Sequence, residues 1–197
     1  MRVATRTWLV WMLALVALPA AAGEPAFVEG EWQVKQGKWR FEDGELVCEG
    51  KGTSSLIYRK GFSARDLELA AEVKFLGKES SAGLVFRARG KSYYRDITFY
   101  QLEWYTEGHH HGTRLSLMRK TPRWKQIVKP LFEAPPMGRW IRFRVVARGE
   151  RLTCFVDGKK VFETRDRAFL RPGQVGLHVF QARAVRFRRP TTRSFDK

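Results

Sequence analysis

The sequence has little of several features that define specialised classes of protein. It contains two cysteines in 197 residues, too few for a disulfide-rich scaffold or for a zinc site built mainly from thiolates. It has no glycine at every third position, which excludes collagen. Its one long apolar run is at the N-terminus, which excludes a protein that crosses the membrane several times. Acidic residues are also scarce.

What the sequence does contain indicates a basic globular protein. Lys and Arg number 37 against 20 Asp and Glu, which gives a formal net charge of +17. Hydrophobic residues make up 44% of the chain, enough to build a core. The composition therefore argues against disorder despite the charge.

The first 22 residues have the layout of a secretory signal peptide. Arg2 and Arg6 supply the positive charge, residues 8–18 are apolar, and Pro19 precedes three alanines that suit a cleavage site. The apolar run is short for a membrane span, and an uncleaved membrane anchor is the alternative. We expect cleavage after Ala22, export to the periplasm or the medium, and no transmembrane span in the mature chain.

The rest of the chain alternates apolar and polar residues with a period of two. Residues 67–75 and 141–147 are examples, and such alternation is typical of strands with one buried face. Asp157-Gly158 is a favoured two-residue hairpin turn. The pattern predicts an all-β antiparallel β-sandwich. We expect a single domain over residues 23–189 and a flexible basic tail over residues 190–197.

Cys48 and Cys154 each lie in phase with apolar neighbours. Leu46 shares a face with Cys48, and Leu152 shares one with Cys154. This pattern favours two buried free thiols. A disulfide between them is the alternative, since export would permit it.

A series of short motifs resembles a known family. The motifs, in chain order, are Gly37-x-Trp39, Glu42-Asp43-Gly44-Glu45-Leu46, Ala82-Gly83-Leu84-Val85-Phe86-Arg87, Gly138-Arg139-Trp140, Val156-Asp157-Gly158, Gly173-x-Val175-Gly176-Leu177 and Val185-Arg186-Phe187-Arg188. Over about residues 27–189 the chain is similar to exported bacterial 3-keto-disaccharide hydrolase-like domains. The resemblance implies a concanavalin A-like, laminin-G-like jelly roll whose concave sheet carries a carbohydrate site. It also implies that Arg87, Gln101 and His178 lie on that face.

Strand phase gives a similar set of residues. If Leu84, Leu102 and Leu177 face the core, the opposite face of one sheet receives the polar residues between them. These candidate substrate-binding residues are Arg87, Gln101, Glu103, Tyr105 and His178. A cation, an amide, a carboxylate, a phenol and an imidazole together suit sugar hydroxyls. The alternative is an ordinary solvated sheet face.

Whether the site is catalytic stays open at this stage. Glycoside hydrolysis uses two carboxylates about 5 to 9.5 Å apart, whereas Glu103 and Glu107 would lie about 13 Å apart along one strand. Glu103 and His178 are weak catalytic candidates, and an enzyme here would be glycoside hydrolase-like. The sequence has no phosphate-binding loop, dinucleotide fingerprint or Ser-His-Asp motif, and we expect no cofactor.

Three consecutive histidines follow the central strand of this site. His109 and His111 could bind zinc or nickel together with Glu107. A solvated loop at the rim of the site, with no metal, is the interpretation we favour.

The basic charge supports a second hypothesis from a different class. Arg142, Arg144 and Arg148 share one side of a strand, and Arg186 and Arg188 share one side of the last strand. Further basic residues are Arg119, Lys120, Arg123, Lys125, Arg183, Arg189 and Arg193. Such a face could dock anionic polymers or an anionic envelope surface without catalysis. Nucleic acid is not an expected partner of an exported protein. The alternative is charge that only protects sheet edges.

Overall fold

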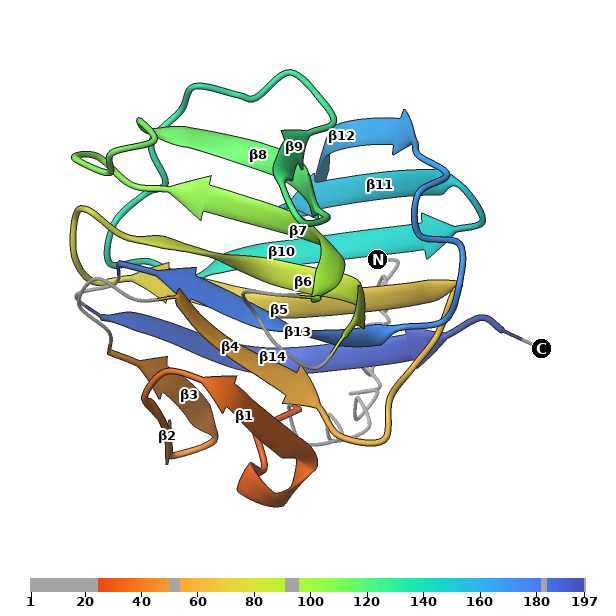
Figure 1. Ribbon diagram of the computed structural model, residues 1–197. Helices are drawn as coiled ribbons and strands as arrows, with labels where there is room; N and C mark the ends of the chain where they lie inside the picture. Colours follow the sequence, from red (N-terminus) through yellow and green to blue (C-terminus); the bar gives the residue numbers. More distant parts are fainter. Residues whose placement is uncertain (1–24, 50–53, 91–95, 182–183, 197) are drawn as a thin grey trace, which may run out of the picture.

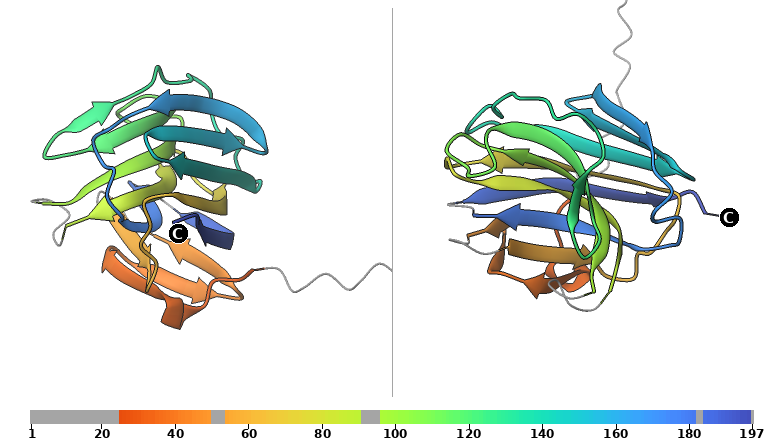
Figure 2. Two further views of the ribbon diagram at one scale, coloured as in Figure 1. Left: turned by 90° about the vertical axis from the view of Figure 1, so that its right-hand side faces the viewer. Right: turned by 45° about the horizontal axis from the view of Figure 1, so that its top comes forward.

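The computed structural model describes residues 25–49, 54–90, 96–181 and 184–196. These residues form two seven-stranded antiparallel sheets that pack face to face (Figures 1 and 2). The predicted all-β jelly-roll sandwich is confirmed. A short 3-10 helix, η1 (Glu29–Glu31), precedes the first strand.

The strand order within each sheet mixes distant parts of the chain. The first sheet runs β1 (Trp32–Gln36), β4 (Ser54–Arg59), β13 (Gln174–Phe180), β6 (Ser81–Arg89), β7 (Thr98–Tyr105), β8 (Arg114–Lys120) and β9 (Trp124–Gln126). The second runs β12 (Lys159–Arg165), β11 (Arg151–Val156), β10 (Ile141–Arg148), β5 (Leu67–Phe75), β14 (Val185–Ser194), β3 (Glu45–Cys48) and β2 (Trp39–Glu42).

The core lies between the two sheets and follows the predicted alternation. In β5, every second residue from Leu67 to Phe75 is fully buried. Leu84, Leu102 and Leu177 of the first sheet belong to the same core cluster. The intervening residues of that sheet therefore point to its outer face.

The β11–β12 hairpin has the turn that its sequence predicts. Asp157 and Gly158 both adopt positive φ angles, 47° and 79°. Two consecutive residues with positive φ define the turn whose twist matches a two-residue hairpin. Asp157 also accepts a hydrogen bond from the Arg142 backbone N–H at 2.8 Å, which ties the turn to β10.

The two cysteines are buried free thiols and do not form a disulfide. Cys48 lies in β3 and Cys154 in β11, with β14, β5 and β10 between them. Four strand spacings separate them by about 19 Å, far beyond the Cα separation that a disulfide spans. Burial raises the pKa of the Cys48 thiol to about 11.

Most of the C-terminal segment is sheet, so the expectation of a flexible tail over residues 190–197 is wrong for residues 190–194, which belong to β14. β14 continues to Ser194, and Thr191 and Thr192 pair with β5. A register shift between Arg188 and Thr191 contains Pro190, whose missing N–H cannot join a ladder. Asp196 then accepts hydrogen bonds from the backbone N–H groups of Arg65 and Asp66 at 2.7 and 2.8 Å.

The expected signal peptide, residues 1–22, lies outside the described residues. Within the described ranges, no helix has the length and apolar character to span a bilayer.

Candidate functional site

The outer face of the first sheet carries its polar residues in rows that cross the strands. His178 of β13 pairs with Gly83 of β6, and Gly83 pairs with Glu103 of β7. Because glycine has no side chain, the imidazole and the carboxylate from two non-adjacent strands can meet above β6. A Cβ at Gly83 would lie 1.8 Å from the Leu102 carbonyl oxygen, so the strands approach more closely here than another residue would permit.

Glu103 is a buried carboxylate with three donors around it. Its Oε1 accepts a hydrogen bond from the Ser81 hydroxyl at 2.7 Å, and its Oε2 accepts one from the Tyr105 hydroxyl at 2.6 Å. Burial alone would raise the pKa of Glu103. The attraction of His178 and the hydrogen bonds from His178, Tyr105 and Ser81 outweigh burial and lower the pKa. Glu103 is therefore a carboxylate anion at neutral pH.

His178 contacts two side chains through one ring nitrogen. Its Nδ1 lies 3.1 Å from Glu103 Oε1 and 2.7 Å from Gln101 Nε2. A protonated Nδ1 donates to the carboxylate, whereas an unprotonated Nδ1 accepts from the amide. The imidazole of His178 therefore lies against a buried carboxylate, an arrangement that suits acid–base chemistry.

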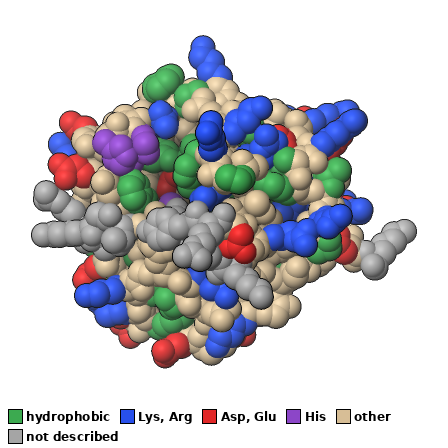
Figure 3. Space-filling model, viewed as in Figure 1, with side chains coloured by type: hydrophobic (Ala, Val, Ile, Leu, Met, Phe, Trp, Pro, Cys, Tyr) green, Lys and Arg blue, Asp and Glu red, His purple; other side chains and the backbone are tan. Residues whose placement is uncertain are grey.

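Glu103, Tyr105 and His178 line a pocket of about 330 Å³ on the outer face. Its lining residues are Ser54, Glu103, Tyr105, His111, Arg114, Met118, Lys120, Trp124, His178 and Phe180. Exposed Trp124 and half-buried Phe180 add aromatic surface. Histidine side chains gather beside hydrophobic ones at the upper left of Figure 3, where Figure 1 shows the β7–β8 loop.

Strand β8 contributes residues that the sequence analysis did not assign to the site. Arg114, Met118 and Lys120 occupy alternate positions of β8 and pair with Tyr105, Gln101 and Phe99 of β7. Lys120 is 6% exposed, and burial lowers the pKa of its ammonium. Its Nζ lies 5.7 Å from the centre of the Trp124 ring. The period of two in β8 predicts that these three residues share one face. The sequence does not show that β8 pairs with β7, so it could not place that face in the site.

The structure does not bring Arg87 to this face, and that expectation was wrong. A register shift between Phe86 and Arg89 marks a β-bulge in β6, and Arg87 there has a φ of 51°. The extra residue reverses the alternation, because a bulge breaks the period of two. Ala88, instead of Arg87, joins the outer cluster with Val85 and Phe99.

Arg87 instead closes one end of the sandwich. Its side chain is fully buried and donates to three backbone carbonyls: Arg65 at 2.6 Å, Phe169 at 3.1 Å and Gly149 at 2.7 Å. Its Nη2 also lies 3.5 Å from Asp66 Oδ1. These partners come from three separate connections of the chain, so Arg87 is a structural residue.

The histidine loop packs against the site in a way that does not assemble the proposed metal ligands. His109 is 4% exposed, and its Nδ1 accepts the His111 backbone N–H at 3.1 Å. Glu107 pairs with Lys78 at 2.8 Å. Within the described ranges, no group of three His, Cys, Asp or Glu side chains is arranged to hold a metal.

The arginines of the proposed basic face are largely matched with acids. On the outer side of the second sheet, Arg144 pairs with Glu68, and Arg188 pairs with Glu72. Arg186 pairs with both Glu42 and Glu45. Arg142 donates to the Arg189 carbonyl and to the Thr191 hydroxyl. These contacts neutralise much of the charge that the sequence pattern assigned to this face.

A family model described as the 3-keto-alpha-glucoside-1,2-lyase-like domain matches residues 26–192. The chain belongs to this family. The match covers both sheets and confirms the family resemblance of the sequence motifs. No curated protein matches the chain.

Solved structures show the same fold as this 3-keto-α-glucoside-1,2-lyase-like domain at low sequence identity. The carbohydrate-binding module CBM66 from Bacillus subtilis is 17% identical, with a TM-score of 0.70 over 83% of this chain and 96% of that one. A Bacillus subtilis protein with a galectin-like fold is 11% identical, with a TM-score of 0.71 over 87% and 94%. The Bacillus licheniformis β-glucanase is 9% identical, with a TM-score of 0.62 over 88% and 97%.

The pocket of this 3-keto-α-glucoside-1,2-lyase-like domain has one carboxylate. Glu103 is the only Asp or Glu among the described residues that line it. Hydrolysis by the usual glycosidase route needs a second acid across the sugar.

Proposed function

We propose that the protein binds a sugar in the Glu103–His178 pocket and catalyses elimination across C1 and C2 of a 3-keto glucoside. The observation that carries the proposal is the contact between His178 Nδ1 and Glu103 Oε1 at 3.1 Å in the wall of a pocket. The family description, which names a 1,2-lyase of 3-keto-α-glucosides, supports the choice of reaction.

The reaction needs one base that can also return a proton. The ketone at C3 acidifies the proton on C2, and the imidazole of His178, held at Nδ1 against Glu103 and Gln101, takes that proton. The electron pair moves first into the enolate and then into a C1–C2 double bond as the C1–O bond breaks. The leaving oxygen receives the proton from His178. Glu103, as an anion, stabilises the imidazolium between these two transfers.

Two cations in the lining suit the charge that develops on the sugar. Lys120 and Arg114 line the pocket with His178, and a cation near O3 would stabilise the enolate. The aromatic face of Trp124 beside Lys120 suits the apolar face of a pyranose. We further infer that the protein works after export, since residues 1–22 have the pattern of a signal peptide.

The test is turnover of an aryl 3-keto-α-glucoside by the mature chain. Elimination releases the aryl alcohol together with a conjugated enone that absorbs in the near ultraviolet. We expect His178→Ala to lower kcat by about 100-fold or more, the usual range for loss of a general base. Lys35→Ala, an exposed change in β1 of the same sheet, should leave kcat unchanged.

Two outcomes would count against the lyase proposal. Wild-type turnover that His178→Ala does not reduce would remove His178 from the chemistry. Wild-type protein that binds the unoxidised aryl α-glucoside but leaves its 3-keto form intact would be a sugar-binding module without this activity.

A further inference from the structure

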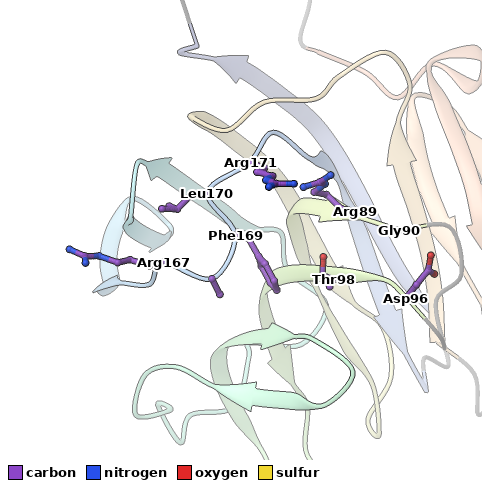
Figure 4. A pocket seen from close by; sticks show the side chains of 9 residues that line it. Arg89, Gly90, Asp96, Thr98, Arg167, Phe169, Leu170 and Arg171 are labelled. Carbon is purple, nitrogen blue, oxygen red and sulfur yellow. The ribbon is translucent and has the colours of Figure 1, made fainter.

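A second pocket at one end of the sandwich collects arginines. It measures about 500 Å³ and shares no lining residue with the Glu103–His178 pocket. Figure 4 shows its side chains arising from the ends of β6 and β7 and from the loop between β12 and β13. The lining residues are Arg89, Gly90, Asp96, Thr98, Arg167, Ala168, Phe169, Leu170 and Arg171.

The charges of this pocket are not balanced within it. Arg167 pairs with Glu150, which lies outside the lining. The side chains of Arg89 and Arg171 form no ion pair or hydrogen bond with any residue in the described part of the chain. Figure 4 shows their side chains pointing toward one another, with Asp96 apart from them in that view. Two guanidinium groups that line one pocket and form no ion pair with a described residue attract an anion, and their planar donors match a carboxylate.

The neighbouring surface suits a sugar ring. Phe169 is half-buried in the pocket and packs against Tyr100 with ring centroids 4.9 Å apart. Leu170 is 40% exposed beside it, and Thr98 adds a hydroxyl. The pocket thus offers an apolar ring face and a hydroxyl beside the two guanidinium groups. An inorganic anion would contact only the guanidinium groups, whereas a sugar with a carboxylate could contact all of them.

We propose that this pocket binds a carboxylate-bearing sugar, a uronic acid residue of an acidic glycan, through Arg89 and Arg171. The proposal goes beyond the elimination chemistry, because the second pocket uses different residues from another part of the surface. Acidic glycans would then bind at Arg89 and Arg171. They would not bind at the arginines of the second sheet, which form ion pairs with glutamates.

The experiment measures trigalacturonic acid binding to the mature chain by calorimetry at two salt concentrations. We expect binding to weaken about tenfold in Arg89→Ala and again in Arg171→Ala, the size of one lost charge-assisted hydrogen bond each. Higher salt should weaken wild-type binding, since exposed charges are screened. Lys35→Ala removes one charge from β1 and should leave the affinity unchanged, as should His178→Ala.

Other results would overturn the proposal. Equal loss in Lys35→Ala and Arg171→Ala would indicate attraction to net charge alone. Wild-type protein that does not bind trigalacturonic acid, or a double arginine variant that binds it normally, would exclude the site. Tighter binding of sulfated maltotriose than of trigalacturonic acid would exclude a carboxylate-specific pocket. Loss of trigalacturonic acid binding in His178→Ala would move the site to the Glu103–His178 pocket, so the two proposals can fail separately.

Discussion

Glu103 and His178 meet above Gly83, although they belong to strands that are not neighbours in the sheet. The residue between them is paired with both, His178 on one side and Glu103 on the other. A carboxylate and an imidazole 3.1 Å apart are thus a consequence of one missing side chain in β6.

We expect Gly83→Ala to disrupt this arrangement. The added Cβ would lie 1.8 Å from the Leu102 carbonyl oxygen and 2.7 Å from Glu103 Cα, so β6 and β7 must move apart. Chemical denaturation should show a loss of stability of about 1 to 3 kcal/mol or more, and sugar binding should fall. Gly30→Ala is the matched control, because its Cβ would meet nothing within 4 Å. Equal stability of the two variants would contradict the prediction.

Local alternation predicts which face a residue takes as long as its strand is regular. Residues 101–105 of β7 and His178 of β13 lie on uninterrupted stretches, and the structure brings the polar ones together. Alternation also separates the buried residues of β5 from its polar ones. These assignments follow from the period of two and need no knowledge of strand pairing.

The sequence placed Arg87 in the site wrongly and left out the residues of β8, because both positions depend on contacts between distant parts of the chain. The bulge at Arg87 and the partner of β8 are set by packing between distant segments, which leaves no local signal. The separation of Cys48 from Cys154 likewise follows from strand order. For the same reason, the sequence could not assign Lys120 and Trp124 to the pocket. They lie there because β8 pairs with β7 and β9 pairs with β8.

Arg87→Ala should destabilise the fold. The change removes the donor that the carbonyls of Arg65, Phe169 and Gly149 share, and each hydrogen bond to a charged group contributes about 1.5 to 3 kcal/mol. Urea unfolding should show a loss of about 3 kcal/mol or more. Arg123→Ala, on the exposed β8–β9 turn, should stay within about 0.5 kcal/mol of wild type.

Sugar binding per folded molecule also tests whether Arg87 is structural and lies outside the sugar site. Because Arg87 lies outside the Glu103–His178 pocket, the folded fraction of Arg87→Ala should bind sugar as wild type does. A stable Arg87→Ala protein that has lost sugar binding would return Arg87 to the site.

Glu103 should contribute to acid sensitivity. Its folded-state pKa lies below the ordinary value of 4.5, so its stabilising effect is complete above that pH and is lost as the pH falls through the lower folded-state value. Glu103→Gln should therefore show a shallower fall of unfolding free energy below pH 4.5, by up to about 1.4 kcal/mol per pH unit. Urea unfolding at several pH values measures this slope. An unchanged slope would mean that Glu103 titrates alike in both states.

His109 should produce a separate effect at higher pH. It is 4% exposed and packs between Tyr105 and Phe180, with ring centroids 4.7 and 5.6 Å away. Burial, the largest cause, lowers its pKa from 6.5 to about 4. Between these values the unfolded chain binds a proton at His109 that the native protein does not.

The free energy of unfolding should therefore fall as the pH drops from 6.5 to about 4, and this contribution should level off below that range. The slope due to His109 is at most about 1.4 kcal/mol per pH unit. His109→Asn keeps an acceptor for the His111 N–H but cannot titrate, so its stability should change less across this interval. His110 is the exposed neighbour of His109. His110→Asn is therefore the matched control and should retain the wild-type slope. If His109→Asn and wild type lose stability in parallel from pH 6.5 to 4, the buried ring is not the group that responds to pH.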